Sequence, residues 1–309
     1  MTDDRATLTS LSSDGIHEFG SLIDVERAAD IYRKAMQLRQ FGPDLFSTEQ
    51  EYTANPQHWG VNPREGRNFT EQFTEELSCI EQHPVLREAL TEMLGRSYTI
   101  HNKKFVCAIP DAWFPDYLRR ITSEKSINNL GAYIRPEFRD ITYFRGIDFH
   151  QDVIDWPAWT PEKRTHQFLT LYVYIHDVTE HDAPLVVLPG SHRFGATRFP
   201  HALSRQQDGR WVYGDGLGRS MSCEQRVLTG ATGNAALWHS CLLHGTEQRT
   251  AGRCRLSLRY ILQRAEGDTP VGLDTLNASI SGPLYLEESR VDLDATGKVV
   301  LPSGSARIS

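Results

Sequence analysis

The sequence predicts a mainly β protein with flanking helices, in which antiparallel strands form a sandwich or barrel. From residue 97 onwards, short apolar runs with alternating polarity follow one another, separated by turns rich in glycine and proline. The residues before 97 instead show apolar spacing that is typical of helices. No glycine-rich nucleotide-binding motif accompanies the strands. Dense short strands with such turns favour antiparallel packing over a parallel sheet.

The composition narrows the function classes. The chain has 309 residues, of which 39% are hydrophobic and 24% charged, so it can bury a sizeable core. A net charge of −7 without a long basic stretch argues against a nucleic-acid partner. No apolar run approaches the length of about 18 residues that a membrane span needs. The N-terminus does not resemble a signal peptide and the five cysteines lack CxxC spacing, so we expect a reduced, cytoplasmic protein.

The N-terminal part, about residues 15–95, is expected to be helical. Asp24 is a suitable N-cap, and the apolar stripe that follows it predicts a helix over 25–38. A second helical pattern covers 70–80. A third begins at Pro84, since proline is favoured at the first position of a helix.

The next part, about residues 97–265, is expected to form the β core of a single domain that covers residues 1–309. Its strand-like runs are SYTIHNKKFVCAI, GAYIRPEFRDITYF, FRGIDFHQD, THQFLTLYVYIHDV, LVVL, VLTGATGNAALWHSCLLHGT and GRCRLSLRYILQR. Residues 266–309 form a polar C-terminal extension, in which VDLDATGKVVL resembles a small hairpin.

A histidine and an aspartate two residues apart provide the first two candidate metal ligands. In a strand, His150 and Asp152 project to one face while Gln151 points away. Such a pair alone is more often structural, so a third ligand is needed. His244 ends a late apolar run, and antiparallel barrels bring early and late strands together. Two histidines and one carboxylate on one face, with open positions, are typical of non-haem Fe(II) and oxygen chemistry. These three residues are therefore the predicted catalytic and metal-binding residues.

An arginine and a serine downstream of His244 form a candidate anion clamp. Arg255 and Ser257 share a strand face by alternation. An inward arginine in a barrel needs an anionic partner, because an unpaired buried charge is costly. A dicarboxylate co-substrate would supply that partner, with its far carboxylate on Arg255 and Ser257 and its 2-oxo acid end on the iron.

Together these motifs resemble the phytanoyl-CoA dioxygenase family of Fe(II)/2-oxoglutarate-dependent oxygenases. The resemblance covers about residues 15–265 and rests on four segments: HQD at 150–152, PLVVLPGSHR at 184–193, HG at 244–245 and RLS at 255–257. It implies a double-stranded β-helix (jelly-roll) core. It also implies iron held by His150, Asp152 and His244, and 2-oxoglutarate held by Arg255 and Ser257.

The family pattern also suggests further co-substrate contacts. Tyr172 matches an aromatic position near the co-substrate, and Asn102 or Lys104 would add a polar contact from the first core strand. The chain departs from the pattern at 182–184, where the turn residues are Asp-Ala-Pro.

Four residues are expected to contact the substrate: Gln151, Arg145, Trp156 and Trp238. Core packing is the alternative for Trp156, and a surface position is the alternative for Arg145. If Arg145 faced the substrate, an anionic or carbonyl-bearing molecule would be favoured. His192 is expected to be structural.

The sequence thus predicts a dioxygenase that hydroxylates, or otherwise oxidises, a small molecule with release of succinate and CO2. A natural product or secondary metabolite is the expected substrate. The resemblance implies that Asp152 disfavours halogenation, in which chloride takes the coordination site of the carboxylate. The alternatives are a hydroxylase of an acyl-thioester or amino-acid-derived metabolite, a catalytically silent jelly-roll binding protein, and a cupin-like metalloenzyme without 2-oxoglutarate. The sequence leaves open the substrate, the choice between hydroxylation and desaturation or cyclisation, and the oligomeric state.

Overall fold

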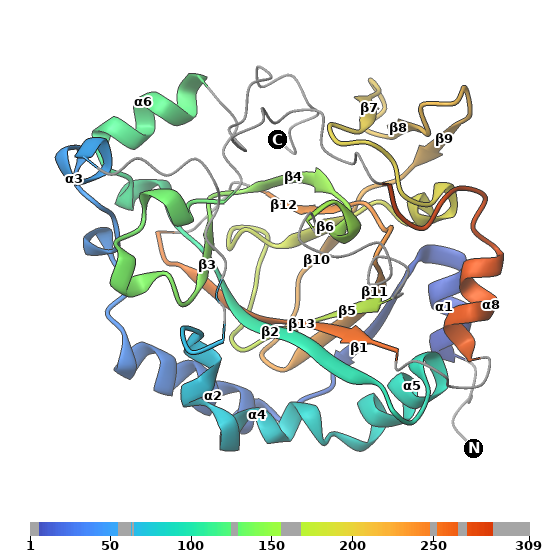
Figure 1. The fold of residues 1–309 in the computed structure, drawn as a ribbon, viewed down its shortest axis with the longest axis horizontal. Helices are drawn as coiled ribbons and strands as arrows, with labels where there is room; N and C mark the ends of the chain where they lie inside the picture. The colour runs from blue at the N-terminus through green and yellow to red at the C-terminus, as the bar shows by residue number, and fades with distance from the viewer. Residues whose placement is uncertain are drawn as a thin grey trace.

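Two facing β-sheets with helices on one outer side make up the fold (Figure 1). The computed structural model describes residues 6–54, 63, 65–124, 129–155, 168–247, 252–264 and 271–286.

The larger sheet has six strands in the order β1-β11-β5-β13-β2-β3. Their bounds are β1 Ile16–Ser21, β2 Thr99–Ala108, β3 Thr142–Phe144, β5 Phe168–Tyr174, β11 Asn234–His239 and β13 Arg255–Gln263. All neighbouring pairs are antiparallel except β2 and β3, which are parallel. The late strand β13 lies between β5 and β2, so distant parts of the chain meet at the centre of this sheet.

The smaller sheet has four strands in the order β10-β6-β12-β4, and its pairs are antiparallel. Its strands are β4 Ile147–His150, β6 Leu185–Val187, β10 Arg226–Leu228 and β12 His244–Thr246. A third sheet consists of β7 Ala202–Arg205, β8 Trp211–Gly214 and β9 Ser220–Cys223. The predicted fold class, mainly antiparallel β with flanking helices and a jelly-roll core, is confirmed.

The helices predicted in the N-terminal part are also confirmed. The α-helices are α1 Ala6–Asp14, α2 Val25–Leu38, α3 Glu49–Ala54, α4 Thr74–Glu81, α5 Pro84–Leu94, α6 Asp116–Glu124 and α8 Gly272–Ala278. Asp24 caps α2 as expected, because its side chain accepts a hydrogen bond from Arg27 N at 3.1 Å. Pro84 stands in the first turn of α5, and Gly95 follows its end with a φ of 87°.

Short 3-10 helices connect these elements at η1 Pro43–Leu45, η2 Phe69–Gln72, η3 Asp111–Trp113, η4 Gly131–Tyr133, η5 Pro136–Phe138, η6 Asp152–Asp155 and η7 Ser191–Phe194. Within the described residues, no helix has both the length and the apolar character to cross a membrane.

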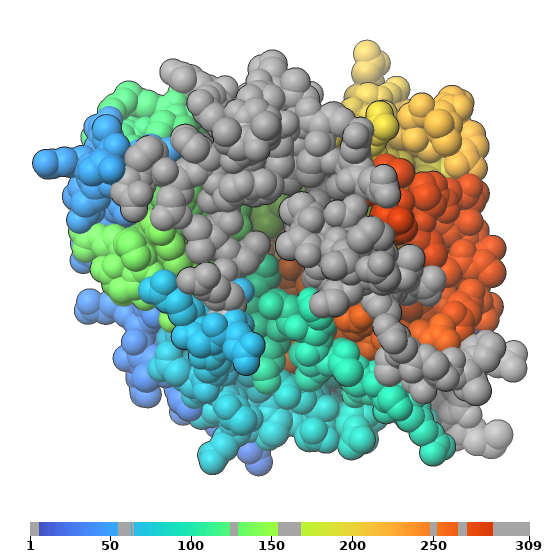
Figure 2. Space-filling model, in the orientation of Figure 1, coloured from blue at the N-terminus to red at the C-terminus, as the bar shows by residue number. Residues whose placement is uncertain are grey.

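The C-terminal extension contains a helix that the sequence pattern did not predict. Helix α8 buries Leu273 and Leu276 and packs against α1 and α5. The chain just after α8 also contacts the turn between β8 and β9, where Arg219 Nη1 donates to Ser281 Oγ at 2.8 Å. Figure 2 shows this part of the chain, in orange and red, beside the yellow strands of the third sheet. The predicted hairpin at VDLDATGKVVL lies outside the described residues.

Strands β5 and β13 alternate between two apolar layers. Their outward side chains join the core beneath the helices: Leu169, Leu171, Val173, Leu256, Leu258 and Tyr260. The inward residues Tyr172 and Tyr174 of β5 belong to a second core between the sheets. On β13 the inward residues Arg255 and Ser257 are polar, and they share this face because they stand two residues apart. The space between the sheets therefore holds the candidate site.

Candidate functional site

The three predicted metal ligands converge between the sheets. Strands β4 and β12 pair so that His150 lies opposite His244, and their ring centres are 4.3 Å apart. One potential ligand atom from each of His150, Asp152 and His244 lies within 4.8 Å of the others. The local structure differs from the prediction, because β4 ends at His150 and Asp152 begins the 3-10 helix η6. The chain turn, rather than strand alternation, brings the carboxylate beside the imidazoles.

Backbone carbonyls orient both imidazoles. His150 Nδ1 lies 3.0 Å from Asp148 O, and His244 Nδ1 lies 2.9 Å from Leu242 O. With the proton on Nδ1 donated to a carbonyl, the Nε2 lone pair of each ring is available to a metal. Burial lowers the pKa of His244 to about 3, which keeps its ring neutral. The two rings thus have the tautomer that metal binding requires.

Asp152 is fully buried and yet ionised. Burial by itself would raise the pKa of this carboxyl, but the charge of Arg259 and the hydrogen bond from Thr170 help to outweigh burial and hold the pKa well below its usual range. Thr170 Oγ1 and Trp238 Nε1 donate to Oδ2 at 2.6 and 3.0 Å. The other oxygen, Oδ1, contacts Arg259 Nη2 and lies 3.6 Å from His244 Nε2. Two donors therefore occupy Oδ2, and Oδ1 faces the histidines.

The predicted anion clamp is completely buried. Arg255 has no exposed surface, and its Nη1 donates to the Tyr172 hydroxyl at 2.6 Å and to Ser257 Oγ at 3.1 Å. The guanidinium carbon lies 5.2 Å from the ring centre of Phe144. Within the described part of the chain, Nε and Nη2 of Arg255 have no hydrogen-bond partner. These two nitrogens form one edge of the guanidinium, and that edge matches the two oxygens of a carboxylate.

The two candidates on β2 lie on the same inner face. Lys104 is paired with Arg259 of β13, which is paired on its other side with Tyr172 of β5. Lys104 is only 7% exposed, and it has an interaction partner of its own. Asn102 lies opposite Ile261 and is half-buried. A contact of either residue with a co-substrate stays a prediction.

The expected substrate contact of Gln151 does not fit the structure. Gln151 is fully buried, and its Nε2 donates to Gly195 O at 2.8 Å and to Cys241 O at 2.7 Å. Its Oε1 accepts from Thr197 N at 2.9 Å. Because backbone groups occupy both ends of the amide, Gln151 joins the η7 loop and the β11–β12 turn to the ligand segment. It has a structural role.

The other three expected substrate residues have different outcomes. Trp238 is 1% exposed and donates to Asp152, so it orients a predicted metal ligand and is shielded from solvent. Arg145 forms a two-bond ion pair with Asp111, at 2.7 and 2.8 Å, so its guanidinium already has an anionic partner. Trp156 lies outside the described residues.

The sequence interpretation missed Thr170 and Arg259. The strand alternation contained the information, since Thr170 stands two residues before Tyr172 and Arg259 stands two residues after Ser257. Continuing the alternation along each strand would have placed both on the inner face. It could not have shown that both contact Asp152, because these contacts join distant parts of the chain.

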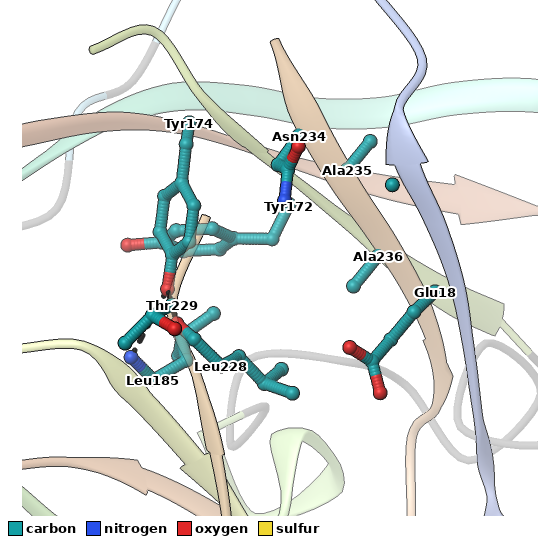
Figure 3. A pocket seen from close by; sticks show the side chains of 10 residues that line it. Glu18, Tyr172, Tyr174, Leu185, Leu228, Thr229, Asn234, Ala235 and Ala236 are labelled. Atoms are coloured by element: carbon teal, nitrogen blue, oxygen red, sulfur yellow. Dashed lines mark hydrogen bonds between the residues drawn. The ribbon is translucent and has the colours of Figure 1, made fainter. Parts of the chain in front are cut away.

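A pocket separate from the clamp has Tyr172 in its wall, while Arg255 and Ser257 do not line it. It is lined by Glu18, Gly20, Tyr172, Tyr174, Leu185, Leu228, Thr229, Asn234, Ala235 and Ala236. Figure 3 shows the two tyrosine rings on one side of this pocket and Glu18 on the other. The Glu18 carboxylate is paired with Arg226 at 3.2 Å. Tyr172 is thus shared between the pocket wall and the hydrogen bonds of Arg255.

Comparisons with known proteins agree with this fold. Residues 136–256 match the family model Phytanoyl-CoA dioxygenase (PhyH), which confirms the resemblance that the sequence motifs predict. The matched segment contains His150, Asp152 and His244 and reaches Arg255. A search of curated proteins found no match.

Solved structures with the same fold have low sequence identity. EvdO2 from Micromonospora carbonacea var. aurantiaca is similar with a TM-score of 0.51 and 14% identity, covering 88% of this chain and 96% of that one. The same protein complexed with 2-oxoglutarate is similar with a TM-score of 0.51 and 13% identity, again covering 88% of this chain and 96% of that one. The epimerase SnoN, in complex with Fe3+, alpha ketoglutarate and nogalamycin RO, is similar with a TM-score of 0.50 and 13% identity, covering 96% of this chain and 95% of that one. These similarities establish the fold.

Trp238→Phe should weaken metal binding, because it removes one of the two donors that orient Asp152. We expect the affinity for Mn²⁺ to fall by about 10- to 100-fold, the usual effect of losing a hydrogen-bond partner of a metal ligand. Electron paramagnetic resonance of unbound Mn²⁺ measures this change. The matched control is Trp211→Phe, which removes a buried indole donor bonded to Gln225, outside the site. Equal Mn²⁺ affinity in wild type and Trp238→Phe would contradict the assigned role of Trp238.

Proposed function

We propose that this protein is an Fe(II)- and 2-oxoglutarate-dependent oxygenase. One observation carries the proposal. The buried guanidinium of Arg255 offers an edge with two N–H groups that no described residue accepts, between the same sheets as His150, Asp152 and His244. A buried cation with two unpaired donors is costly unless an anion binds there, and a carboxylate has the matching shape. A metal triad and an anion clamp in one interior are what a metal-chelating dicarboxylate requires.

The residues present fit a divalent iron ion. Two neutral imidazoles and one ionised carboxylate are the ligand set of non-haem Fe(II) sites. Thr170 and Trp238 occupy Oδ2 of Asp152, so Oδ1, which faces His244 and also contacts Arg259, is the oxygen that would bind the metal. These three residues would hold the metal from one side and leave it room to bind 2-oxoglutarate and dioxygen.

The chain's own residues would hold the co-substrate and exclude water. Arg255 would bind the far carboxylate of 2-oxoglutarate through Nε and Nη2, while the Tyr172 hydroxyl and Ser257 keep the guanidinium in place. The aromatic rings of Phe144, Tyr172 and Tyr174 surround the guanidinium and keep the carboxylate contact in a region of low dielectric constant. The bound iron would supply the activation of dioxygen, with 2-oxoglutarate converted to succinate and CO2 and a C–H bond of the substrate oxidised.

A small molecule of secondary metabolism is the proposed substrate, and hydroxylation is the proposed reaction. The carboxylate ligand Asp152 favours hydroxylation over halogenation. The epimerase SnoN, in complex with nogalamycin RO, illustrates that this fold also carries other reactions. An acyl-thioester or amino-acid-derived substrate is the second candidate. A catalytically silent binding protein is disfavoured, because the metal triad and the clamp are both intact. A cytoplasmic location is part of the proposal.

His244→Ala and Asp152→Ala should each abolish turnover. With Fe(II), 2-oxoglutarate and oxygen, the wild type is expected to form succinate slowly even without substrate. Each variant should lose more activity than the roughly 10- to 100-fold that loss of an outer partner causes, since a ligand itself is removed. Succinate and bound iron are measured together, with His181→Ala, at an exposed histidine, as control. Wild-type turnover and iron content in either ligand variant would contradict the ligand assignment.

Arg255→Gln should weaken 2-oxoglutarate binding selectively. Removing one partner of a buried charge pair typically costs about 2–5 kcal/mol, so we expect a loss of roughly 30-fold or more in affinity. The comparison ligand is 2-oxopentanoate, which keeps the metal-chelating end but lacks the far carboxylate. Its binding, measured by calorimetry with Mn²⁺, should change little. An equal loss for both oxo acids, or no loss for 2-oxoglutarate, would contradict the clamp.

A further inference from the structure

Arg259 is a second cation on the inner face of β13. Its Nη2 contacts Oδ1 of Asp152, the oxygen that faces His244. Among the described residues, Asp152 is the one hydrogen-bond partner of Arg259. Its side chain is 14% exposed, whereas Arg255 is completely buried. Part of the Arg259 side chain, next to Asp152, is therefore not covered by the described residues.

The surroundings of Arg259 concentrate positive charge in one row across the sheet. Arg259 is paired with Lys104 on β2, and directly paired residues on antiparallel strands have Cβ atoms about 4.5–5.5 Å apart. Like charges in this position repel each other. Lys104 has a partner of its own, so the argument rests on Arg259.

The charge of Arg259 exceeds what the proposed co-substrate complex needs. A divalent metal, the carboxylate of Asp152, the guanidinium of Arg255 and the two carboxylates of 2-oxoglutarate neutralise one another. Arg259 then adds one positive charge in a largely dehydrated interior, where an uncompensated charge is costly. Within the described part of the chain, no carboxylate other than Asp152 contacts Arg259, so the substrate is the reactant that can compensate this charge.

We propose that Arg259 binds a carboxylate of the substrate beside the metal, so that the substrate class is a small organic acid. This inference rests on the proposed function and names the substrate class of the same site. The Cα atoms of Arg255 and Arg259 are four residues apart on one strand, which is about 13 Å. The two arginines also have different protein contacts: Tyr172 and Ser257 for Arg255, and Asp152 for Arg259. They are therefore suited to bind two separate anions.

The planar guanidinium group of arginine has five N–H donors, so one arginine can bind two carboxylates at once. One edge of the guanidinium can stay on Asp152 while its other N–H groups bind the incoming carboxylate. The substrate acid would thus be fixed at a set distance from Asp152. Such positioning of a nearby, non-reacting group selects which C–H bond of the substrate faces the metal.

Paramagnetic relaxation with Mn²⁺ as the metal tests this inference. The full chain is loaded with Mn²⁺ and 2-oxoglutarate without oxygen, and the proton relaxation rates of benzoate and its neutral analogue benzamide are measured by NMR. Relaxation by Mn²⁺ reports only probes that bind close to the metal. Wild type, Arg259→Gln, Arg259→Lys and the exposed control Arg210→Gln are compared.

The wild type and Arg210→Gln should bind benzoate near the metal and benzamide much more weakly. Arg259→Gln should lower the benzoate affinity by about tenfold or more, the effect of losing a charged hydrogen-bond partner. Arg259→Lys should recover part of the loss, because it restores the charge without the fork. Equal relaxation of both probes in the wild type would overturn the inference. So would undiminished benzoate binding in Arg259→Gln, which would mean that the acid binds the metal directly.

The binding of Mn²⁺ and 2-oxoglutarate is measured first, in every variant. A wild type that bound neither would contradict the proposed function itself. A loss of 2-oxoglutarate binding in Arg259→Gln, with benzoate binding intact, would assign Arg259 to the co-substrate and overturn the inference.

Discussion

The buried carboxylate of Asp152 is the group on which the rest of the site depends. Asp152 follows the edge strand β4 of the smaller sheet. Its hydrogen-bond partners come from three strands of the larger sheet: Thr170 on β5, Trp238 on β11 and Arg259 on β13. An ionised carboxylate without exposed surface is tolerated only when its lone pairs are occupied. The same contacts therefore join the two sheets and aim Oδ1 at the histidines. The proposed metal binding and the contact between the sheets thus depend on the same set of hydrogen bonds.

The neighbouring residue Gln151 fixes the other side of the ligand segment. Its amide binds the backbone of Gly195, Thr197 and Cys241, so the peptide between His150 and Asp152 is anchored from outside the site. One of these partners, Gly195, lies at a position where only glycine fits. A Cβ at Gly195 would lie 2.3 Å from Pro283 O, and the φ of 71° there favours glycine. Three consecutive residues thus combine two proposed metal ligands with one anchor, and the anchor holds both side chains in position.

Much of this arrangement could be predicted from the sequence, because periodicity is local. Alternation along the strands gave the fold class and the inward direction of Arg255 and Ser257, and the cap and proline signals gave α2 and α5. The contacts of single side chains could not be predicted in the same way. Strand β4 ends at His150, and the local pattern does not show where a strand stops. The bond from Trp238 to Asp152 and the hydrogen bonds that occupy the Gln151 amide join residues more than 40 positions apart. Residue type alone placed Gln151 and Trp238 with the substrate, whereas their partners place them with the scaffold.

The central claim is that one interior holds both a metal and a dicarboxylate. The most direct measurement is a crystal structure of the full chain grown without oxygen in the presence of Mn²⁺ and 2-oxoglutarate. The account predicts Mn²⁺ bound by Nε2 of His150, Nε2 of His244 and Oδ1 of Asp152, with the far carboxylate of 2-oxoglutarate on Nε and Nη2 of Arg255. A metal bound by other residues, or 2-oxoglutarate with no carboxylate on Arg255, would contradict it.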